Sequence, residues 1–288
     1  MLDQTTNTRQ VIRLSRGVPT SDGAGVKLNR VIGNQALSEL DPFLLLDEFR
    51  SEDGADYIGG FPDHPHRGFE TVTYMLAGRM RHGDNKGHTG ILRPGSVQWM
   101  TAGRGIVHSE MPEQEDGLMW GFQLWVNLPA ADKMTAPRYQ EFDPADVPVA
   151  TLPGGVRVHV VAGNVGDVTG PVTGIATAPS YFDVELPAGA SATLELPAGQ
   201  NAFAYPFEGD ACIGAAQIDQ GGTLIPRGTL AVLGEGNQVV LGAEAAPARV
   251  LIVAGQPLNE QVVRYGPFVM NTQEQIRQAI TDFQAGRF

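Results

Sequence analysis

The sequence has almost no cysteine: Cys212 is the only one in 288 residues. An internal disulfide and a cysteine-based metal site are therefore both excluded, and a reducing compartment is expected. The first residues, MLDQTTNTRQVIRLSRG, lack the apolar stretch of a signal peptide. No apolar run approaches the length of a membrane span. We therefore expect a soluble cytoplasmic protein without a membrane partner.

Basic residues are also in the minority. The chain has 20 Lys and Arg against 32 Asp and Glu, which gives a formal net charge of −12. Sequence-independent binding to a nucleic acid requires a basic surface, whose Lys and Arg side chains displace counterions from the phosphates. The charge balance therefore argues against direct nucleic-acid binding and is compatible with a small-molecule ligand or a protein partner.

Helical periodicity is scarce, whereas turn residues are abundant. The 36 Gly and 20 Pro are spread along the chain, as expected for many turns between short strands. FETVTYML (69–76), QLWVNL (123–128), VRVHVVAG (156–163) and ARVLIVAG (248–255) have strand-like composition. Only NTQEQIRQAITDFQAG near the end predicts a helix, with Asn271 and Glu274 as its capping box and Ile276, Ile280 and Phe283 on one face.

A faint internal repeat divides the chain. GILRPGSVQWMTAG (90–103) resembles GTLIPRGTLAVLGEG (222–236) in residue type, and 65–80 precedes the first copy much as 197–211 precedes the second. This favours duplication of an all-β module. A stretch rich in proline and charge precedes the second copy and predicts a linker. We expect domains at 1–132 and 149–260, a linker at 133–148, and a tail at 261–288.

The most informative pattern uses three of the six histidines. In HPHRGFE (64–70), His64 and His66 are two positions apart, and so are His108 and Glu110 in VHSE (107–110). Residues i and i+2 of a strand face the same side, so two such pairs on neighbouring strands can converge on one cavity. Three imidazoles and a carboxylate suit a divalent first-row metal and leave coordination positions open, and imidazole disfavours calcium.

Each of these residues also has a plainer interpretation. One is that His64 and His66 lie in a surface loop beside a proline. Another is that His108 and Glu110 form an ordinary hydrogen-bonded pair. Glu70 is an alternative ligand that is equally suited to pair with an arginine. Two further histidines, His82 and His88, fall in the turn-rich stretch RHGDNKGHTG, where solvent exposure is the simpler expectation, and His159 in VRVHVV is simplest as a strand histidine.

Longer motifs resemble the pirin family of the cupin superfamily. They are FPDHPHRGFETVTYMLAGRMRHGD, GHTGILRPGSVQWMTAGRGIVHSEMP, FQLWVNLP, DPFLLLDEF and the tail GPFVMNTQEQIRQAITDFQAGRF. The resemblance is dense over 41–129 and in the tail, and thin over 130–260. It implies an all-β bicupin: two cupin-type β-barrels with a short C-terminal helix. Only the N-terminal barrel then holds a metal, because PAGQN (197–201), aligned with HPH, contains no histidine.

The resemblance also implies the ligands. Carried over residue by residue, they are His64, His66, His108 and Glu110, with Glu110 favoured over Glu70 as the carboxylate. The implied cofactor is one divalent ion, with Fe²⁺ favoured and Ni, Mn, Cu, Zn or Co as alternatives.

Two functions follow from this resemblance. The first is a dioxygenase that opens a flavonol-like ring with O2, in the manner of a quercetin 2,3-dioxygenase. Glu110 would act as its general base, and an apolar barrel mouth near Phe61, Phe69 and Trp99 would take the flat substrate. The alternative is an iron-dependent, redox-sensing regulator that binds a transcription factor or a metabolic enzyme. An isomerase is a weaker third option, because only Arg67 and Arg104 lie near the motifs to bind a sugar phosphate.

Overall fold

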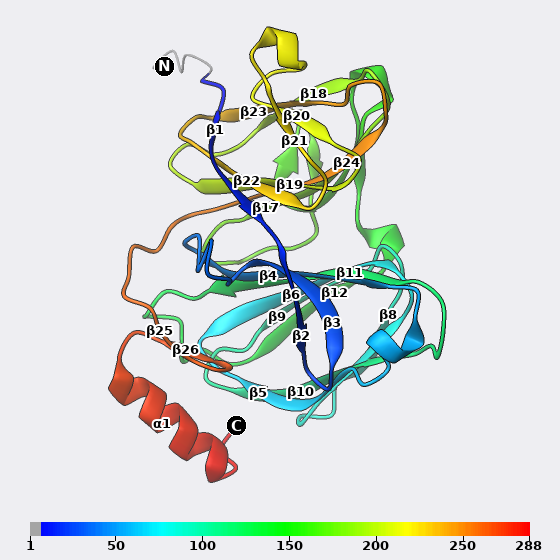
Figure 1. The fold of residues 1–288 in the computed structure, drawn as a ribbon. Coiled ribbons are helices and arrows are strands. Elements are labelled where there is room, and N and C mark those ends of the chain that lie inside the picture. Colours follow the sequence, from blue (N-terminus) through cyan, green and yellow to red (C-terminus); the bar gives the residue numbers. More distant parts are fainter. Residues whose placement is uncertain (1–6) are drawn as a thin grey trace. The chain divides into compact units, whose positions relative to one another are not determined.

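The computed structural model describes residues 7–288 and divides them into two compact units. One unit, which we call the N-terminal barrel, joins Val18–Asp146 with Leu258–Phe288. The other, the C-terminal barrel, joins the segment that ends at Gly17 with Val147–Pro257. Figure 1 labels many of the strands of both units and the one α-helix of the described residues.

These boundaries differ from the expected domain limits because distant segments complete the sheets. Strand β1 (Val11–Arg16) pairs with β22 (Thr229–Leu233) and so belongs to the C-terminal barrel. Strand β12 (Arg138–Phe142) lies within the expected linker, yet it pairs with β9 (Val97–Thr101) of the N-terminal barrel. The tail joins the N-terminal barrel as well. Local composition carries no signal for such edge pairing, which satisfies backbone groups of an outer strand.

The N-terminal barrel is built from two antiparallel sheets. The larger has the order β12-β9-β6-β11-β4-β3-β2 and the smaller the order β5-β10-β7-β8. Their strands are β2 (Val18–Asp22), β3 (Val26–Ile32), β4 (Phe43–Ser51), β5 (Phe61–His66), β6 (Phe69–Ala77), β7 (Met80–Asp84), β8 (Thr89–Leu92), β9, β10 (Ile106–Pro112), β11 (Met119–Asn127) and β12. Side chains from both sheets, including Leu28, Met75 and Leu92, form a small buried apolar cluster.

The C-terminal barrel repeats this arrangement. Its larger sheet has the order β1-β22-β19-β24-β17-β14-β13 and its smaller sheet the order β18-β23-β20-β21. The remaining strands are β13 (Val149–Thr151), β14 (Arg157–Ala162), β15 (Asn164–Val165), β16 (Val168–Thr169), β17 (Ser180–Leu186), β18 (Ser191–Glu195), β19 (Asn201–Glu208), β20 (Ala211–Ile213), β21 (Thr223–Ile225), β23 (Gln238–Gly242) and β24 (Ala248–Gly255). An extensive cluster of Ala, Val, Leu, Ile and Phe fills it.

The tail ends in the helix α1 (Gln273–Gln284), which follows the hairpin of β25 (Val263–Tyr265) and β26 (Phe268–Met270) (Figure 1). The helix was expected, but its capping box lies one residue later than predicted. Thr272 accepts from the Gln275 backbone, and the Gln275 side chain accepts from the Thr272 backbone. Asn271 and Glu274 do not form this pair, because Thr272 is the residue with the extended N-cap conformation. Among residues 7–288, no helix has the length and apolar character needed to cross a membrane.

Candidate metal centre

The two histidine-bearing strands are neighbours in the smaller sheet of the N-terminal barrel. Strands β5 and β10 pair antiparallel, with His108 opposite His64 and Ile106 opposite His66. A register shift between His108 and Glu110 places Glu110 opposite Phe61. Strand β5 is the edge strand of its sheet, which accommodates Pro65 because proline has no N–H to donate to a second neighbour. The strand pairing therefore brings His108 beside His64 and His66.

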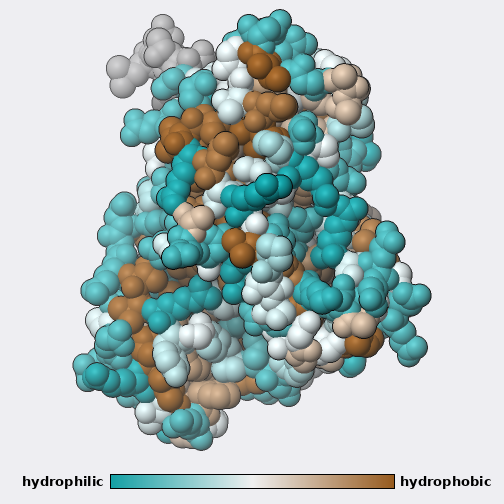
Figure 2. Space-filling view, viewed as in Figure 1, coloured by the Kyte–Doolittle hydropathy of each residue, from teal (hydrophilic) through white to brown (hydrophobic). Residues whose placement is uncertain are grey.

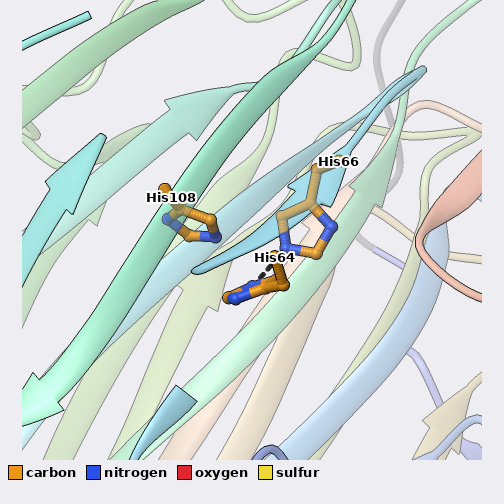
Figure 3. Close-up of side chains that lie close together, drawn as sticks. All are labelled: His64, His66 and His108. Atoms are coloured by element: carbon orange, nitrogen blue, oxygen red, sulfur yellow. Dashed lines mark hydrogen bonds between the residues drawn. The ribbon is translucent and has the colours of Figure 1, made fainter. Parts of the chain in front are cut away.

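Three imidazoles meet in a compact group. His64, His66 and His108 can each offer a ring nitrogen such that all three nitrogens lie within 4.8 Å of one another. The Nε2 atoms of His64 and His66 are 3.0 Å apart, and the ring centroid of His108 is 4.4 Å from that of His64 and 5.0 Å from that of His66. Figure 3 shows the three rings turned toward one another from the two strands.

The hydrogen bonding of this group fits a bound cation. The Nδ1 atom of His64 lies 2.9 Å from the carbonyl oxygen of Pro62. Because a carbonyl can only accept, Nδ1 carries the proton, and in the neutral ring Nε2 keeps a lone pair for a metal. Both ring nitrogens of His108 are buried and have no hydrogen-bond partner in the part of the chain that the structure describes. A buried polar atom without a partner is costly, and a divalent ion would satisfy one of these two nitrogens.

Burial lowers the pKa of two of these rings, His66 and His108. The side chains of His66 and His108 are 2% and 1% exposed. Desolvation lowers the pKa of His66 well below its usual value, and the neighbouring His108 and His64 lower it further. The pKa of His108 is lowered in the same way, by burial first and by His64 and His82 next. Neutral imidazole is the form that coordinates metals, so no proton has to be removed from these two residues at neutral pH.

Glu110 lies in the same cavity but is held by its neighbours. It is 4% exposed; its Oε1 accepts from the Thr73 hydroxyl at 2.8 Å, and its Oε2 accepts from the Gln123 side-chain amide at 3.3 Å. It is not part of the three-histidine group. Thr73 and Gln123 come from β6 and β11 and were missed from the sequence. Because they face each other in the register of these strands, only the sheet pairing reveals them.

Glu70, the alternative carboxylate, faces the other side of its sheet. Thr73 lines the cavity, and in β6 the odd-numbered and even-numbered side chains alternate between faces. Glu70 instead accepts from the Thr101 hydroxyl at 2.7 Å, and its burial raises its pKa.

The remaining histidines lie outside the three-histidine group. His82 is 4% exposed, contrary to expectation, and its Nε2 lies 2.7 Å from a carboxylate oxygen of Glu141. His88 has an exposed side chain that meets Asp84, and His159 meets Glu185, as expected of a strand histidine.

A cavity of about 510 Å³ opens beside the triad. Its walls are mainly apolar and aromatic, with Phe49, Phe61 and Trp125 among the lining residues. Phe61 was expected there. Trp99 pairs with Val72 and so faces away from Thr73, and Phe69 packs instead against the rings of His66 and Trp125. The lining set is Asp22, Gly23, Ala24, Leu28, Leu45, Asp47, Phe49, Phe61, Pro62, Asp63, His64, His66, Thr73, Met80, Glu110, Gln123, Trp125, Arg264, Gly266 and Pro267.

Two small β-barrels, one of them with an inward-facing histidine triad, define a bicupin. Family models agree: the model described as Pirin matches residues 25–126, and the model of the pirin C-terminal cupin domain matches residues 181–288. The chain therefore belongs to the pirin family, which confirms the resemblance and the all-β bicupin fold.

Relatives match nearly the whole chain. A Pseudomonas aeruginosa protein named "Putative quercetin 2,3-dioxygenase" is 50% identical over 98% of this chain and 98% of its own length. Pirin from Homo sapiens is 46% identical over 92% of this chain and 88% of its own.

Solved structures agree. The crystal structure of quercetin 2,3-dioxygenase from Acinetobacter baumannii is 34% identical, covers 98% of this chain and 99% of its own, and superposes with a TM-score of 0.87. An Escherichia coli pirin in complex with nickel(II) is 18% identical, covers 85% of this chain and 98% of its own, and has a TM-score of 0.65, so it supports the fold alone.

Proposed function

We propose that this protein is a metal-dependent dioxygenase that opens the ring of a flat hydroxylated aromatic substrate of the flavonol type. The observation that carries the proposal is the position of the triad: His64 and His66 line a mainly apolar cavity of about 510 Å³, and the buried ring of His108 lies directly beside them. Such a cavity has the size and character of a small-molecule site. The names of the Pseudomonas and Acinetobacter relatives support the same reaction.

The residues that would hold the metal are His64, His66 and His108, with Glu110 as a fourth ligand or a hydrogen-bonding neighbour. Nitrogen and carboxylate donors suit a divalent first-row metal. The family resemblance favours Fe²⁺, and Ni²⁺, which the Escherichia coli pirin binds, stays an alternative. A bound divalent ion supplies Lewis acidity, which lowers the pKa of a substrate hydroxyl group.

The chain's own groups would then orient the substrate and take its proton. Phe49, Phe61 and Trp125 offer faces and edges against which a planar ring can pack. Glu110 is the carboxylate placed to accept a hydroxyl proton. Thr73 and Gln123 hold its two oxygens, so its orientation is set before substrate arrives. The apolar walls limit water near the reacting ring.

The test is aerobic incubation of iron-, nickel- or manganese-loaded protein with quercetin, followed by oxygen uptake and product analysis. We expect His66→Ala to lose metal and turnover together. We expect Glu110→Gln to keep most of the metal and lose about 10²–10⁴-fold in turnover, the usual contribution of a general base. Equal ring opening by wild type and His66→Ala would overturn the proposal.

The regulatory alternative stays a prediction. On the face seen in Figure 2, apolar patches are separated by hydrophilic side chains, whereas a large protein interface favours a broad apolar area. Capture of the same partners with equal affinity by ferrous and ferric protein would remove the redox-sensing idea.

A further inference from the structure

Arg264 is placed to contact whatever occupies the cavity. It is the only Lys or Arg among the described residues that line it. It comes from β25 in the tail, and its guanidinium carbon lies 4.6 Å from the centre of the Trp125 ring. The Trp125 ring in turn lies 5.2 Å from the His66 ring. The guanidinium and the His66 ring therefore both lie against the same indole. Burial is the main cause of the lowered pKa of His66, and the charge of Arg264 contributes to it.

In the described part of the chain, the nearby carboxylates do not form hydrogen-bonded ion pairs with Arg264. Asp47 and Asp22 are the acidic residues at this end of the cavity, but Arg30 binds both. Its Nε and one Nη lie 2.9 and 2.7 Å from the two oxygens of Asp47, and the same Nη lies 2.8 Å from Asp22. Within residues 7–288, the recorded hydrogen bond of Arg264 is a long one, 3.4 Å from Nε to the carbonyl oxygen of Gly266. Its two Nη groups are therefore available to a ligand.

We propose that Arg264 is a specificity-determining residue that binds a carboxylate on the aromatic ligand. The inference rests on the proposed function, since it assumes that a ring occupies this cavity. A guanidinium offers two parallel N–H groups that match a carboxylate, and stacking on Trp125 holds it in one orientation before the ligand binds. Among flat hydroxylated aromatic compounds, the preferred substrate is thus one that carries a carboxylate group.

A single negative charge fits this site better than a phosphate. Asp63 and Glu110 line the same cavity and would repel a dianion more strongly than a monoanion, and Arg264 is the one Lys or Arg among the described lining residues. A phosphate group is normally held by several donors or cations. A carboxylate carries a single negative charge, and the guanidinium of Arg264 alone can bind both of its oxygens.

The experiment compares two ligands that differ only in the carboxylate. Nickel-loaded protein is titrated calorimetrically, without oxygen, with catechol and with 3,4-dihydroxybenzoate. We expect the acid to bind at least about tenfold more tightly, as one charge-assisted pair supplies. Arg264→Gln should abolish this preference, and Arg264→Lys should retain part of it. Arg277→Gln, in a solvent-exposed stretch of α1, is the matched control and should behave as wild type.

Several results would overturn the inference. They are equal affinity of wild type for both ligands, an undiminished preference in Arg264→Gln, or no binding of either ligand by folded, nickel-loaded protein. Thermal denaturation of each variant shows whether it is folded. The readout is binding, so it is separate from turnover. A protein that prefers the acid but opens no ring retains the Arg264 inference and loses the dioxygenase, whereas ring opening without the preference does the reverse.

Discussion

The two barrels share one strand plan but differ in what faces inward. The smaller sheets run β5-β10-β7-β8 and β18-β23-β20-β21, so the first, fourth, second and third strands of each set are neighbours in the same order. The larger sheets also correspond strand for strand, with β12 of one in the place of β1 of the other. This correspondence supports the duplication that the sequence repeat suggested.

The inward positions of equivalent strands carry opposite chemistry. Strands β5 and β10 present His64, His66, His108 and Glu110. In β18 and β23 of the C-terminal barrel, the corresponding buried side chains are apolar and join its core; they are Ala192, Leu194, Val239 and Leu241. His159, the only histidine of that barrel, pairs with Glu185 instead of a metal-binding neighbour.

This difference separates stability from chemistry within one architecture. Every buried methylene group of an apolar interior stabilises the folded state, whereas buried imidazoles without hydrogen-bond partners destabilise it. The C-terminal barrel shows that the fold itself does not require polar residues at these positions. The histidine triad is therefore explained by what it binds. Substitutions in the apolar core of the C-terminal barrel should lower stability, whereas substitutions in the triad should lower metal affinity.

The largest expected effect is on the apolar barrel. Phe182 is fully buried in its core, and Phe182→Ala should lower the free energy of unfolding by about 3–5 kcal/mol. The metal content of the protein that remains folded should not change. Urea denaturation and elemental analysis measure the two quantities, and Ile218→Ala at an exposed site is the control. A loss below 1 kcal/mol would mean that this core is loosely packed.

The second prediction concerns His108→Val, which gives the N-terminal barrel an apolar side chain like those of the C-terminal barrel. His108→Val replaces a buried ring whose nitrogens lack hydrogen bonds, so the metal-free protein should become about 1–3 kcal/mol more stable. Metal affinity should fall by more than the roughly 10–100-fold that loss of an outer-shell partner costs. Denaturation with chelator present and metal titration test both parts. A destabilised metal-free variant would contradict the assignment of His108 to a ligand role.

The third prediction concerns pH and the metal-free protein. Burial lowers the pKa of His66 and His108 in the folded state, so below about pH 6.5 the unfolded chain binds more protons than the folded one. Their contribution to stability is complete above that pH and falls as the pH drops toward their folded pKa. The slope should approach about 1.4 kcal/mol per pH unit for each histidine.

Denaturation between pH 7 and 5 measures this slope, and His108→Val supplies the comparison because it removes one of the two groups. An identical slope in wild type and variant would show that His108 titrates normally.

Local alternation predicted much of the site. The i, i+2 spacing placed His64 with His66 and His108 with Glu110 because a strand repeats every two residues. The same rule put Glu70 and Thr73 on opposite faces of β6. The lowered pKa values of His66 and His108 and the partner of His82 could not be predicted this way, because they depend on residues of other strands.

Long-range pairing set the limit of that reasoning. Arg264 reaches the cavity from the tail, and Gln123 reaches Glu110 from β11. Strand β1, near the start of the chain, pairs with β22 of the C-terminal barrel, so the domain boundaries differ from the expected ones. Each case joins residues far apart in the chain, and composition near either partner gives no signal for the other.

The smallest expected effect tests the choice between the two carboxylates. Glu70 faces away from the cavity and accepts from Thr101, and an amide oxygen can accept the same bond. Burial raises the pKa of Glu70, so the ionised form is disfavoured in the fold, and Glu70→Gln removes that cost at neutral pH while losing a charge-assisted hydrogen bond. We expect these opposing changes to alter the free energy of unfolding by less than about 1 kcal/mol and to leave metal content unchanged. Loss of metal from this variant would instead place Glu70 among the ligands and displace Glu110 from that role.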